Sequence, residues 1–578
     1  MSSLTQALDQ IQLGENNHIE LKWSNTSFEE ALAQYYFQLV RTKDVTDLRQ
    51  KFNLLLLTED IDKLLLLAKL TMNVRDLNGK GERDLTYMML LEWWNKRPEF
   101  AYYIFETMML SKDQAEPYAS WKDIKYLCNF IKNHTSNTNH PFIVWLVELT
   151  NHHLKIDWDN LIAKKNTKIS LLGKWVPREK SQFSWLFGKL VKNMFARYYE
   201  TAKTPTASKS ADKKARKEYR LICSTLNTLL DTTQIKQCNG KWKYIDPNRV
   251  TSITFSKQKQ ALFNQKMVNR KMVERSESED RRECKEKFVS YLNDKKENKE
   301  TIKGKRVSIY DFVKDAIKYS SHEDGEAQLM KDTINSQWEN NSKQNFSLNN
   351  MIALVDTSGS MECDECTPLY TALGMGIRIS EKSNPAFRNR VLTFDANPQW
   401  FQLNENMTFC EKARHLNHNR WGMNTNFYKM LNMILDVAIQ NKLPPGDVNK
   451  MILVILSDMQ IDANWSGAGH SNMNGMYDEI RERYSQAGIQ AVGEPYTPPH
   501  IVFFNLRKTS GFPVLSTEKN VTMLSGYNPV ALNVFCEKGV EALQEFTPMK
   551  MFKDILDDDR YKIMNDERIL QLAMNDTF

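Results

Sequence analysis

The hydrophobic pattern of this chain changes its period near residue 347. Between residues 28 and 200, apolar side chains recur at three- and four-residue spacing, as in "DIDKLLLLAKLTMNVRDL", which is the spacing of helices that bury one face. After residue 347, short apolar runs such as "MIALVDTS" and "KMILVILSDMQ" alternate with helical segments. Strands that alternate with helices form a largely parallel sheet covered by helices. The sequence therefore predicts a multidomain α and α/β protein.

We place the boundary between the two parts at residues 345 and 346. Residues 1–345 are expected to form a helical-repeat module, because the breaks between helical segments, such as "NGKGERD" and "NKRPE", are short enough for antiparallel helix pairs. Within this module, two basic stretches near 201–218 and 264–306 are expected to be mobile, the first as a loop and the second as a charged helical projection. Residues 346–578 are expected to form the α/β domain, with strands at "MIALVDTS", "RVLTFDANPQWFQL", "KMILVILSDMQ", "HIVFFNLR" and "NVTMLSG".

The composition excludes several classes of protein. Within these 578 residues no apolar stretch approaches the roughly 20 residues of a membrane-spanning helix, so no membrane partner is expected. The first residues, "MSSLTQALDQIQ", lack the basic start and apolar core of a secretory signal. Eight cysteines scattered through the chain suit buried thiols in a reducing compartment. We therefore expect a cytoplasmic monomer, or a virion component if the source is viral.

The net charge of +7 is unevenly distributed, because residues 351–578 carry −6 and residues 1–350 therefore carry +13. Such a basic half favours a polyanionic partner. Aromatic residues that lie near basic ones, such as Trp175, Tyr219 and Trp242, are typical of proteins that stack on single-stranded bases. An ordinary solvated face remains the alternative reading of a charged run. The candidate RNA-binding residues are Lys213, Lys214, Arg216, Lys217, Arg220, Lys257, Lys259, Arg270 and Lys271.

The sequence "DTSGSM" follows the first apolar strand of the second half. Asp356, Ser358 and Ser360 direct one carboxylate and two hydroxyls from a single turn, and Asp458 ends a second apolar strand. Thr425 precedes a predicted helix, although Thr408 is also near. Mg²⁺ prefers oxygen ligands of this kind, with one or two carboxylates. The predicted metal ligands are Asp356, Ser358, Ser360, Thr425 and Asp458, with Mg²⁺ or Mn²⁺ as the ion; the alternative is an ordinary turn capped by small polar residues.

The same residues resemble the metal-ion-dependent adhesion site of von Willebrand factor A domains. The helical half resembles TROVE-like modules at "GKGERDLTYMML", "SWKDIKYL" and "ISLLGKWVPREKS". The two together are similar to the Ro ribonucleoprotein architecture, and closer still to an uncharacterised family, domain of unknown function 2828, of plants, fungi and large DNA viruses. The resemblance covers roughly residues 30–575. It implies an A domain with a Rossmann-like sheet, a ring of helices and binding of structured RNA or single-stranded RNA ends.

Other sites are less well supported. A phosphotransferase of the Asp-x-Asp type needs a second carboxylate where this chain has Ser358. The loop "NGKGERD" lacks the spacing of a P-loop, although Lys80 and Arg83 could touch a phosphate backbone. The pair Cys363 and Cys366 lacks the second pair that a structural zinc site needs.

The sequence therefore predicts a non-enzymatic RNA-binding protein with a magnesium-dependent von Willebrand A domain. The alternative is a scaffold whose metal ion binds an acidic residue of a protein partner.

Overall fold

The structure is a computed structural model of the 578-residue chain. It describes residues 11–13, 19–24, 26–110, 118–165, 168–269, 271–322, 325–345, 348–394, 397–419, 427–459, 473–509, 511–514, 519–535, 545–565 and 571–572. None of the helices within these ranges is both long enough and apolar enough to cross a membrane.

Helices make up the first part of the chain, as the apolar periodicity predicts. A short hairpin of β1 (Ile11–Leu13) and β2 (Ile19–Leu21) precedes them. The helices are α2 (Phe28–Gln38), α3 (Thr46–Leu55), α4 (Ile61–Arg75), α5 (Arg83–Lys96), α6 (Pro98–Leu110), α7 (Lys122–Thr135), α8 (Pro141–Ile162), α9 (Leu172–Trp175), α10 (Ser184–Met194) and α11 (Ala196–Glu200). Consecutive helices pack against each other, for example α4 on α5 and α5 on α6.

The basic stretch 201–218 is helical where the sequence predicts a loop, and its mobility stays a prediction. It forms most of α12 (Pro205–Leu229), a 25-residue helix. Thr204 caps its first turn by accepting a hydrogen bond from the backbone N–H of Ala207 at 3.1 Å. Ala215, Tyr219, Cys223 and Leu226 are buried at helical spacing. This apolar stripe holds the helix on its neighbours although the surrounding residues are Lys, Ser and Thr.

The stretch 264–306 contains a hairpin as well as the predicted charged helix, and its mobility stays a prediction. It contains an antiparallel hairpin of β3 (Gln265–Val268) and β4 (Lys271–Glu274), followed by α15 (Glu279–Glu297). The segment after α15 is held by α17, because the backbone N–H of Gly304 donates to Asn340 Oδ1 at 2.8 Å. The surrounding elements are α13 (Thr233–Cys238), η2 (Trp242–Tyr244), η3 (Pro247–Arg249), α14 (Ser252–Leu262), α16 (Ile309–Ser320) and α17 (Gly325–Ser342).

A six-stranded sheet follows, in the order β10-β9-β8-β5-β6-β7. Its strands are β5 (Met351–Val355), β6 (Arg390–Thr393), β7 (Trp400–Gln402), β8 (Ile452–Ser457), β9 (His500–Asn505) and β10 (Val521–Ser525). All neighbours are parallel except the edge strand β7, which is antiparallel to β6. All five predicted strand regions contain strands, and the α/β class of this part is confirmed.

Helices cover both faces of the sheet. On one face Ala353, Val355 and Val502 belong to the same apolar cluster as α16 and α18. On the other face Ile352 and Ile455 pack with residues of α20 and α22 in a second cluster. The remaining elements are η4 (Gly359–Glu362), α18 (Cys363–Lys382), α19 (Phe409–His418), α20 (Phe427–Gln440), α21 (Pro445–Val448), α22 (Met473–Val492), η5 (Pro529–Phe535), α24 (Pro548–Leu556) and η6 (Asp559–Asn565).

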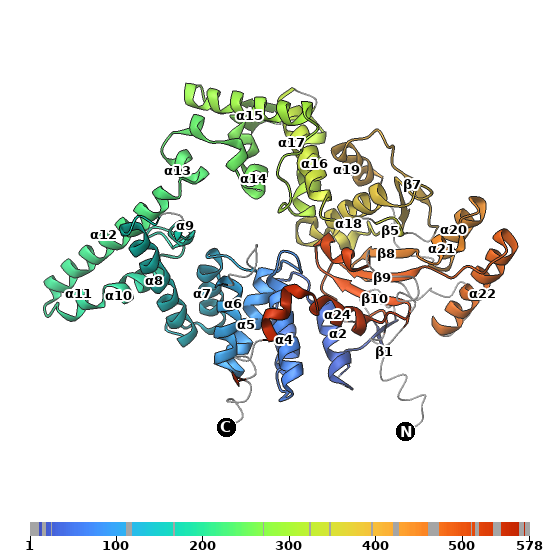
Figure 1. Cartoon of the computed structure of the whole chain (residues 1–578), viewed down its shortest axis with the longest axis horizontal. Coiled ribbons are helices and arrows are strands. Elements are labelled where there is room, and N and C mark those ends of the chain that lie inside the picture. Colours follow the sequence, from blue (N-terminus) through green and yellow to red (C-terminus); the bar gives the residue numbers. More distant parts are fainter. Residues whose placement is uncertain are drawn as a thin grey trace.

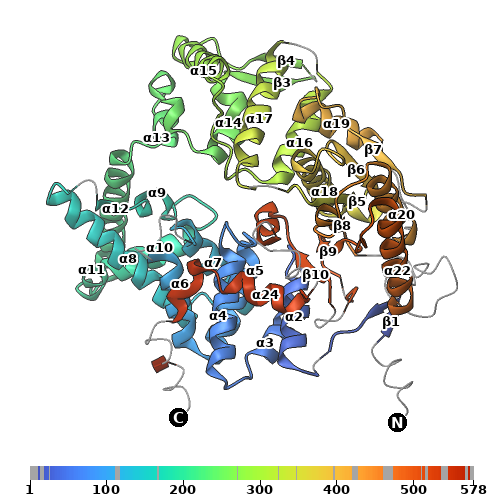
Figure 2. The same ribbon diagram turned by 45° about the vertical axis from the view of Figure 1, so that its right-hand side comes forward.

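The helical part curves round so that both of its ends touch the α/β part. Figures 1 and 2 show the helices from α2 to α17 following an arc, with α14 above α7. At one end α16 packs on α18 and α19, and at the other α2 packs on β10 and α24. The largest apolar cluster contains residues of both parts, such as Leu64, Phe312 and Val355. The boundary between residues 345 and 346 stays a prediction.

Candidate metal centre and nucleic-acid interface

The strand register brings the two predicted metal-binding carboxylates together. In the parallel pair β5 and β8, Val355 lies opposite Leu456. Asp356 therefore follows its strand at the edge of the sheet where Asp458 follows the neighbouring strand. Both residues are buried, with 1% and 0% of their surface exposed. Ligands of parallel sheets bind at this edge, beyond the carboxyl ends of the strands.

The turn after β5 is held by the side chain of Asp356. Its Oδ1 accepts a hydrogen bond from the backbone N–H of Ser358 at 2.8 Å, and its Oδ2 accepts one from the Ser457 hydroxyl at 2.6 Å. The hydroxyls of Ser358 and Ser360 lie 3.1 Å apart. Asp356, Ser358 and Ser360 therefore share one turn, with Asp458 on the adjoining strand end. Thr425 lies outside the described residues, and Thr408 instead caps the start of α19 together with Glu411.

The electrostatics of this edge suit a cation. Burial and the charge of Asp458 raise the pKa of Asp356 to about 6, since two neighbouring carboxylates oppose each other's ionisation. Arg507 offsets part of this charge, because its Nη1 donates to Asp458 Oδ2 at 3.2 Å. Carboxylate and hydroxyl oxygens are the ligands that Mg²⁺ takes, and a divalent ion would relieve the repulsion between the two aspartates. The donors present thus fit the predicted ion.

A strained segment follows the metal-binding turn. Asp364, Glu365 and Cys366 have φ angles of 46°, 59° and 61°, the left-handed region that costs a non-glycine residue about 1–2 kcal/mol. Ion pairs from both sides hold the segment, Lys43 with Asp364 at 3.8 Å and Lys314 with Glu365 at 3.2 Å. In the part of the chain that the structure describes, His, Cys, Asp and Glu side chains do not gather in threes as a zinc site would require.

The candidate RNA-binding residues of α12 fall into two groups. Lys213 and Lys217 are exposed, and Lys214 lies 4.5 Å from the ring centroid of Tyr198. Arg216 and Arg220 are both paired with Glu179, Arg216 at 3.2 Å. Asp212 also pairs with Arg216, at 2.7 Å. Within the described residues the two arginines therefore have carboxylate partners, whereas Lys213, Lys214 and Lys217 form no ion pair.

The candidates outside α12 differ in accessibility. Lys257 on α14 and Lys271 on β4 are exposed, and Arg270 lies outside the described residues. Lys259 is only 3% exposed and pairs with Asp315. A phosphate cannot reach an ammonium in that position, so we correct the prediction for Lys259, whose role is to hold α14 on α16.

Trp175 was predicted to lie near basic residues, but the lysines that surround it were not named. Lys122, Lys125 and Lys174 have their ammonium groups 5.7, 5.1 and 5.1 Å from the centroid of the Trp175 ring. Tyr126 adjoins, with Lys125 5.7 Å from its centroid. We call these five residues the Trp175 cluster. Its signal in the sequence was the i, i+3 spacing in "KDIK", which places two lysines on one face of α7.

The charges of the Trp175 cluster are crowded. Burial, together with the positive charges of Lys122 and Arg178, lowers the pKa of Lys125 to about 8. Burial and the positive charge of Arg83 lower the pKa of Lys122. The positive charge of Lys257 on α14 lowers it further. Within the described residues, no carboxylate forms an ion pair with Lys122, Lys125 or Lys174. Uncompensated, partly buried lysines beside an indole form a site for an anion that carries an aromatic group.

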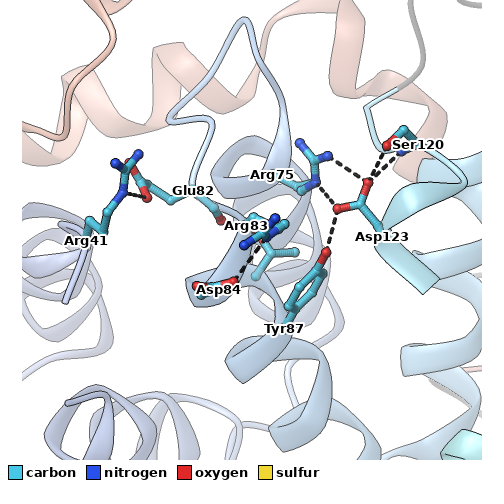
Figure 3. A network of polar contacts seen from close by, with 9 residues as sticks. Arg41, Arg75, Glu82, Arg83, Asp84, Tyr87, Ser120 and Asp123 are labelled. Atoms are coloured by element: carbon cyan, nitrogen blue, oxygen red, sulfur yellow. Dashed lines mark hydrogen bonds and ion pairs between the residues drawn. The ribbon is translucent and has the colours of Figure 1, made fainter. Parts of the chain in front are cut away.

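The carboxylate of Asp123, which follows Lys122 in the chain, is occupied by other donors. It accepts hydrogen bonds from Arg75 Nε and Nη2 at 2.9 and 2.7 Å, and one from the Tyr87 hydroxyl at 2.6 Å. The backbone N–H and the hydroxyl of Ser120 also donate to the Asp123 carboxylate, both at 2.8 Å. Figure 3 shows these donors converging on Asp123. The network anchors the start of α7, which carries Lys122 and Lys125.

The two basic residues of the "NGKGERD" loop have different environments. Lys80 is 5% exposed, and its ammonium donates to the carbonyl oxygens of Tyr36 and Ser525 at 3.0 and 3.1 Å. It therefore joins the helical part to β10 and is closed to a phosphate backbone. Arg83 is partly exposed and lies over the ring of Tyr126, 4.2 Å from its centroid. Of the two, Arg83 borders the Trp175 cluster. Tyr219, by contrast, is a core residue.

These features describe an arc of helices closed by an α/β part with a buried carboxylate pair. Residues 350–574 match a family model described as "Domain of unknown function (DUF7788)". A relative from Acanthamoeba polyphaga mimivirus, "Uncharacterized protein L728", is 24% identical over 551 residues, which cover 92% of this chain and 85% of the relative. The expected resemblance to an uncharacterised family with viral members holds at this coarse level, although the matched model is not the one named from the sequence.

Among solved structures, the crystal structure of the Deinococcus radiodurans RO (RSR) protein is similar to this chain. Its TM-score is 0.33 at 13% identity, over 88% of this chain and 98% of that one. A likeness at this level carries no argument on fold or function.

Proposed function

We propose that this chain is a non-enzymatic RNA-binding protein that holds single-stranded RNA, or single-stranded ends of structured RNA, at the Trp175 cluster. The observation that carries the proposal is the placement of three lysines, without ion-paired carboxylates, around a partly exposed indole. Phosphates would contact the lysines and Arg83, and bases would stack on Trp175. The exposed Lys213, Lys214 and Lys217 of α12 supply a second basic surface.

The metal centre belongs to the same proposal. Asp356, Ser358, Ser360 and Asp458, with Thr425 as the fifth ligand, would hold Mg²⁺ or Mn²⁺ in the manner of a von Willebrand A domain. The buried carboxylate pair supports this assignment. Bound there, the ion supplies positive charge and open coordination positions to a partner.

Binding is tested by fluorescence anisotropy with a short single-stranded RNA over a range of salt concentrations. The double substitution Lys122→Glu and Lys125→Glu should weaken binding at every sequence. For single strands the salt slope changes by about 0.7 per phosphate contact, so the double variant should flatten it by roughly 1.4. Trp175→Ala should cost about 1–3 kcal/mol, the contribution of one stacked base, with little change in slope.

The matched control is the double substitution Lys442→Glu and Lys450→Glu, which makes the same charge change at two exposed residues. Lys450 lies just before β8 and so at the opposite edge of the sheet from Asp458. Equal weakening by this control and by the Lys122→Glu, Lys125→Glu variant would show that only net charge matters. Salt-insensitive binding, or none, would refute the proposal.

The second candidate is the metal-dependent scaffold. Of the two sites, only the carboxylate pair supports it. There the ion would bind a carboxylate of a protein partner, and the Trp175 cluster would be incidental. Recovery of a partner that EDTA releases, with no RNA in the complex, would support this candidate over RNA binding. Packaging in a virion, if the source is viral, belongs with this candidate.

A further inference from the structure

A series of arginine–tyrosine contacts begins beside the Trp175 cluster. The guanidinium carbon of Arg83 lies 4.2 Å from the centroid of Tyr126, a member of that cluster. The residue before it, Glu82, pairs with Arg41 at 3.0 Å. Figure 3 shows Arg41, Glu82 and Arg83 in succession along one side of the α4–α5 region. Arg41 keeps 58% of its side chain exposed despite this pair.

The series continues from Arg41 to the metal centre. The guanidinium carbon of Arg41 is 5.2 Å from the centroid of Tyr527. The Tyr527 hydroxyl donates to the carbonyl oxygen of Leu506 at 3.0 Å. The next residue, Arg507, donates to Asp458 Oδ2 at 3.2 Å. Contacts therefore connect the Trp175 cluster to the carboxylate pair through Arg83, Arg41 and Arg507.

A cleft lies beside the middle of this series. Its volume is about 130 Å³, and its lining includes Arg41, Tyr527, Lys305 and Arg306. The first turn of α16 forms part of the wall, with Ser308 as its N-cap. Cationic side chains thus border the cleft, and they also border the Trp175 cluster and the metal centre. A chain of phosphates is the ligand that such a succession of cations and aromatic rings suits.

The surroundings of the metal centre disfavour a broad protein partner. The end of β9 is covered by α2, because Asn505 Nδ2 donates to the carbonyl oxygen of Phe37 at 3.3 Å. The loop that follows is held by the same helix, since Gln38 Nε2 donates to the carbonyl oxygen of Thr509 at 3.1 Å. With the helical part pressed against this edge of the sheet, an extended strand fits the approach better than a folded domain does.

This inference rests on the proposed RNA binding. We infer that a phosphate group of the bound RNA, and not a carboxylate of a protein partner, completes the coordination of the cation held by Asp356 and Asp458. A non-bridging phosphate oxygen is a hard ligand of the kind that Mg²⁺ prefers. Arg41 keeps 58% of its side chain exposed beside Glu82, and Arg83 keeps 34% exposed. Both would contact phosphates of the same strand, whereas Arg507 holds Asp458 in place. The metal centre and the Trp175 cluster are then two ends of one RNA site.

The test is a phosphorothioate experiment on the full chain. The affinity of one short single-stranded RNA is measured with Mg²⁺ and with EDTA, at matched ionic strength, and again after sulfur replaces a non-bridging oxygen of each phosphate. Mg²⁺ should tighten binding of the unmodified RNA by about tenfold, which corresponds to about 1.4 kcal/mol. The phosphorothioate RNA should lose this gain in Mg²⁺ and recover it in Cd²⁺, since a soft ion accepts sulfur.

A ligand variant ties the effect to this metal centre. Ser360→Ala should abolish the Mg²⁺ gain and the Cd²⁺ recovery. Ser224→Ala, at an exposed serine of α12, is the matched control and should keep both. Thermal melting shows that each variant is folded.

Each other outcome overturns the inference. Equal RNA affinity in Mg²⁺ and EDTA would overturn it and leave RNA binding intact. If Mg²⁺ raises the affinity equally for the unmodified and the phosphorothioate RNA, the ion has a structural role or binds a protein carboxylate. This result would also overturn the inference. The absence of any RNA binding would refute the proposed function itself.

Discussion

Replacement of Asp123 by alanine tests the network that anchors α7. Asp123 has none of its surface exposed, and it accepts five hydrogen bonds from Arg75, Tyr87 and Ser120. Asp123→Ala would leave Arg75, a residue with only 9% of its surface exposed, without its ion-pair partner. Breaking a buried ion pair in this way costs about 3–5 kcal/mol, because an uncompensated charge stays in the interior. We expect Asp123→Ala to lower the free energy of local unfolding by about 3–5 kcal/mol.

The cost comes from the orphaned charge more than from the lost pair, and a double variant separates the two. Arg75→Met with Asp123→Leu removes both charges and fills the space with apolar groups, which is often neutral or stabilising at buried pairs. We therefore expect the double variant to recover most of the stability that Asp123→Ala loses.

The assay must be local, since a chain of this size with two core clusters need not unfold in one step. Amide hydrogen exchange of α7 gives the free energy of local opening, and α19 serves as an internal control because its exchange should not change. A loss below about 1 kcal/mol at α7 in Asp123→Ala, or a double variant as unstable as the single one, would refute the reasoning.

The pH dependence of the same network follows from its charges. Burial alone would raise the pKa of Asp123, but Arg75 and the hydrogen-bond donors hold it below the ordinary value of 3.8. A carboxylate with a lowered pKa stabilises the fold fully above its unfolded pKa. The contribution of Asp123 should therefore persist down to about pH 3.8 and disappear below it, and Asp123→Ala should lack this acid transition.

Two further predictions concern other parts of the fold. Burial lowers the pKa of Lys80 from 10.5 to about 7, so the folded state binds fewer protons than the unfolded state between those values, and stability should rise with pH across this window. The denaturation midpoint of Lys80→Met should lose that rise, and a wild-type midpoint flat from pH 7 to 10 would contradict the assignment. Gly304→Ala would place a Cβ 1.9 Å from the carbonyl oxygen of Gln337; it should destabilise by about 1–3 kcal/mol, as overpacked cores do. Gly325→Ala meets no atom within 4 Å and should be nearly neutral, and similar midpoints for both variants would contradict the argument.

The position of the carboxylate pair was predictable from the sequence. Asp356 and Asp458 each end a run of apolar residues that reads as a buried strand. Parallel neighbouring strands present their carboxyl ends at one edge, so the two side chains had to meet once the strands paired. The short apolar runs also predicted the alternation of strands and helices after residue 347.

Composition was a poorer guide for α12. Its lysines, serines and threonines suggested a loop, but Thr204 provides a cap and Ala215 and Tyr219 lie on one buried stripe. The helix forms because packing of this stripe outweighs the weak helix propensity of Ser and Thr.

The sequence by itself determined the local elements and the carboxylates that follow strands, because hydrophobic period and chain adjacency act over a few residues. Only the tertiary structure decided which cations are available to an anion. Lys259 looks like its neighbour Lys257 in the sequence, yet Asp315, more than fifty residues away, neutralises it in the interior. Lys122, Lys125 and Lys174 stay uncompensated because the fold brings α7 and α9 together beside Trp175 while Arg75 occupies Asp123. Charge pairing depends on distance in space, and a linear pattern does not contain that distance.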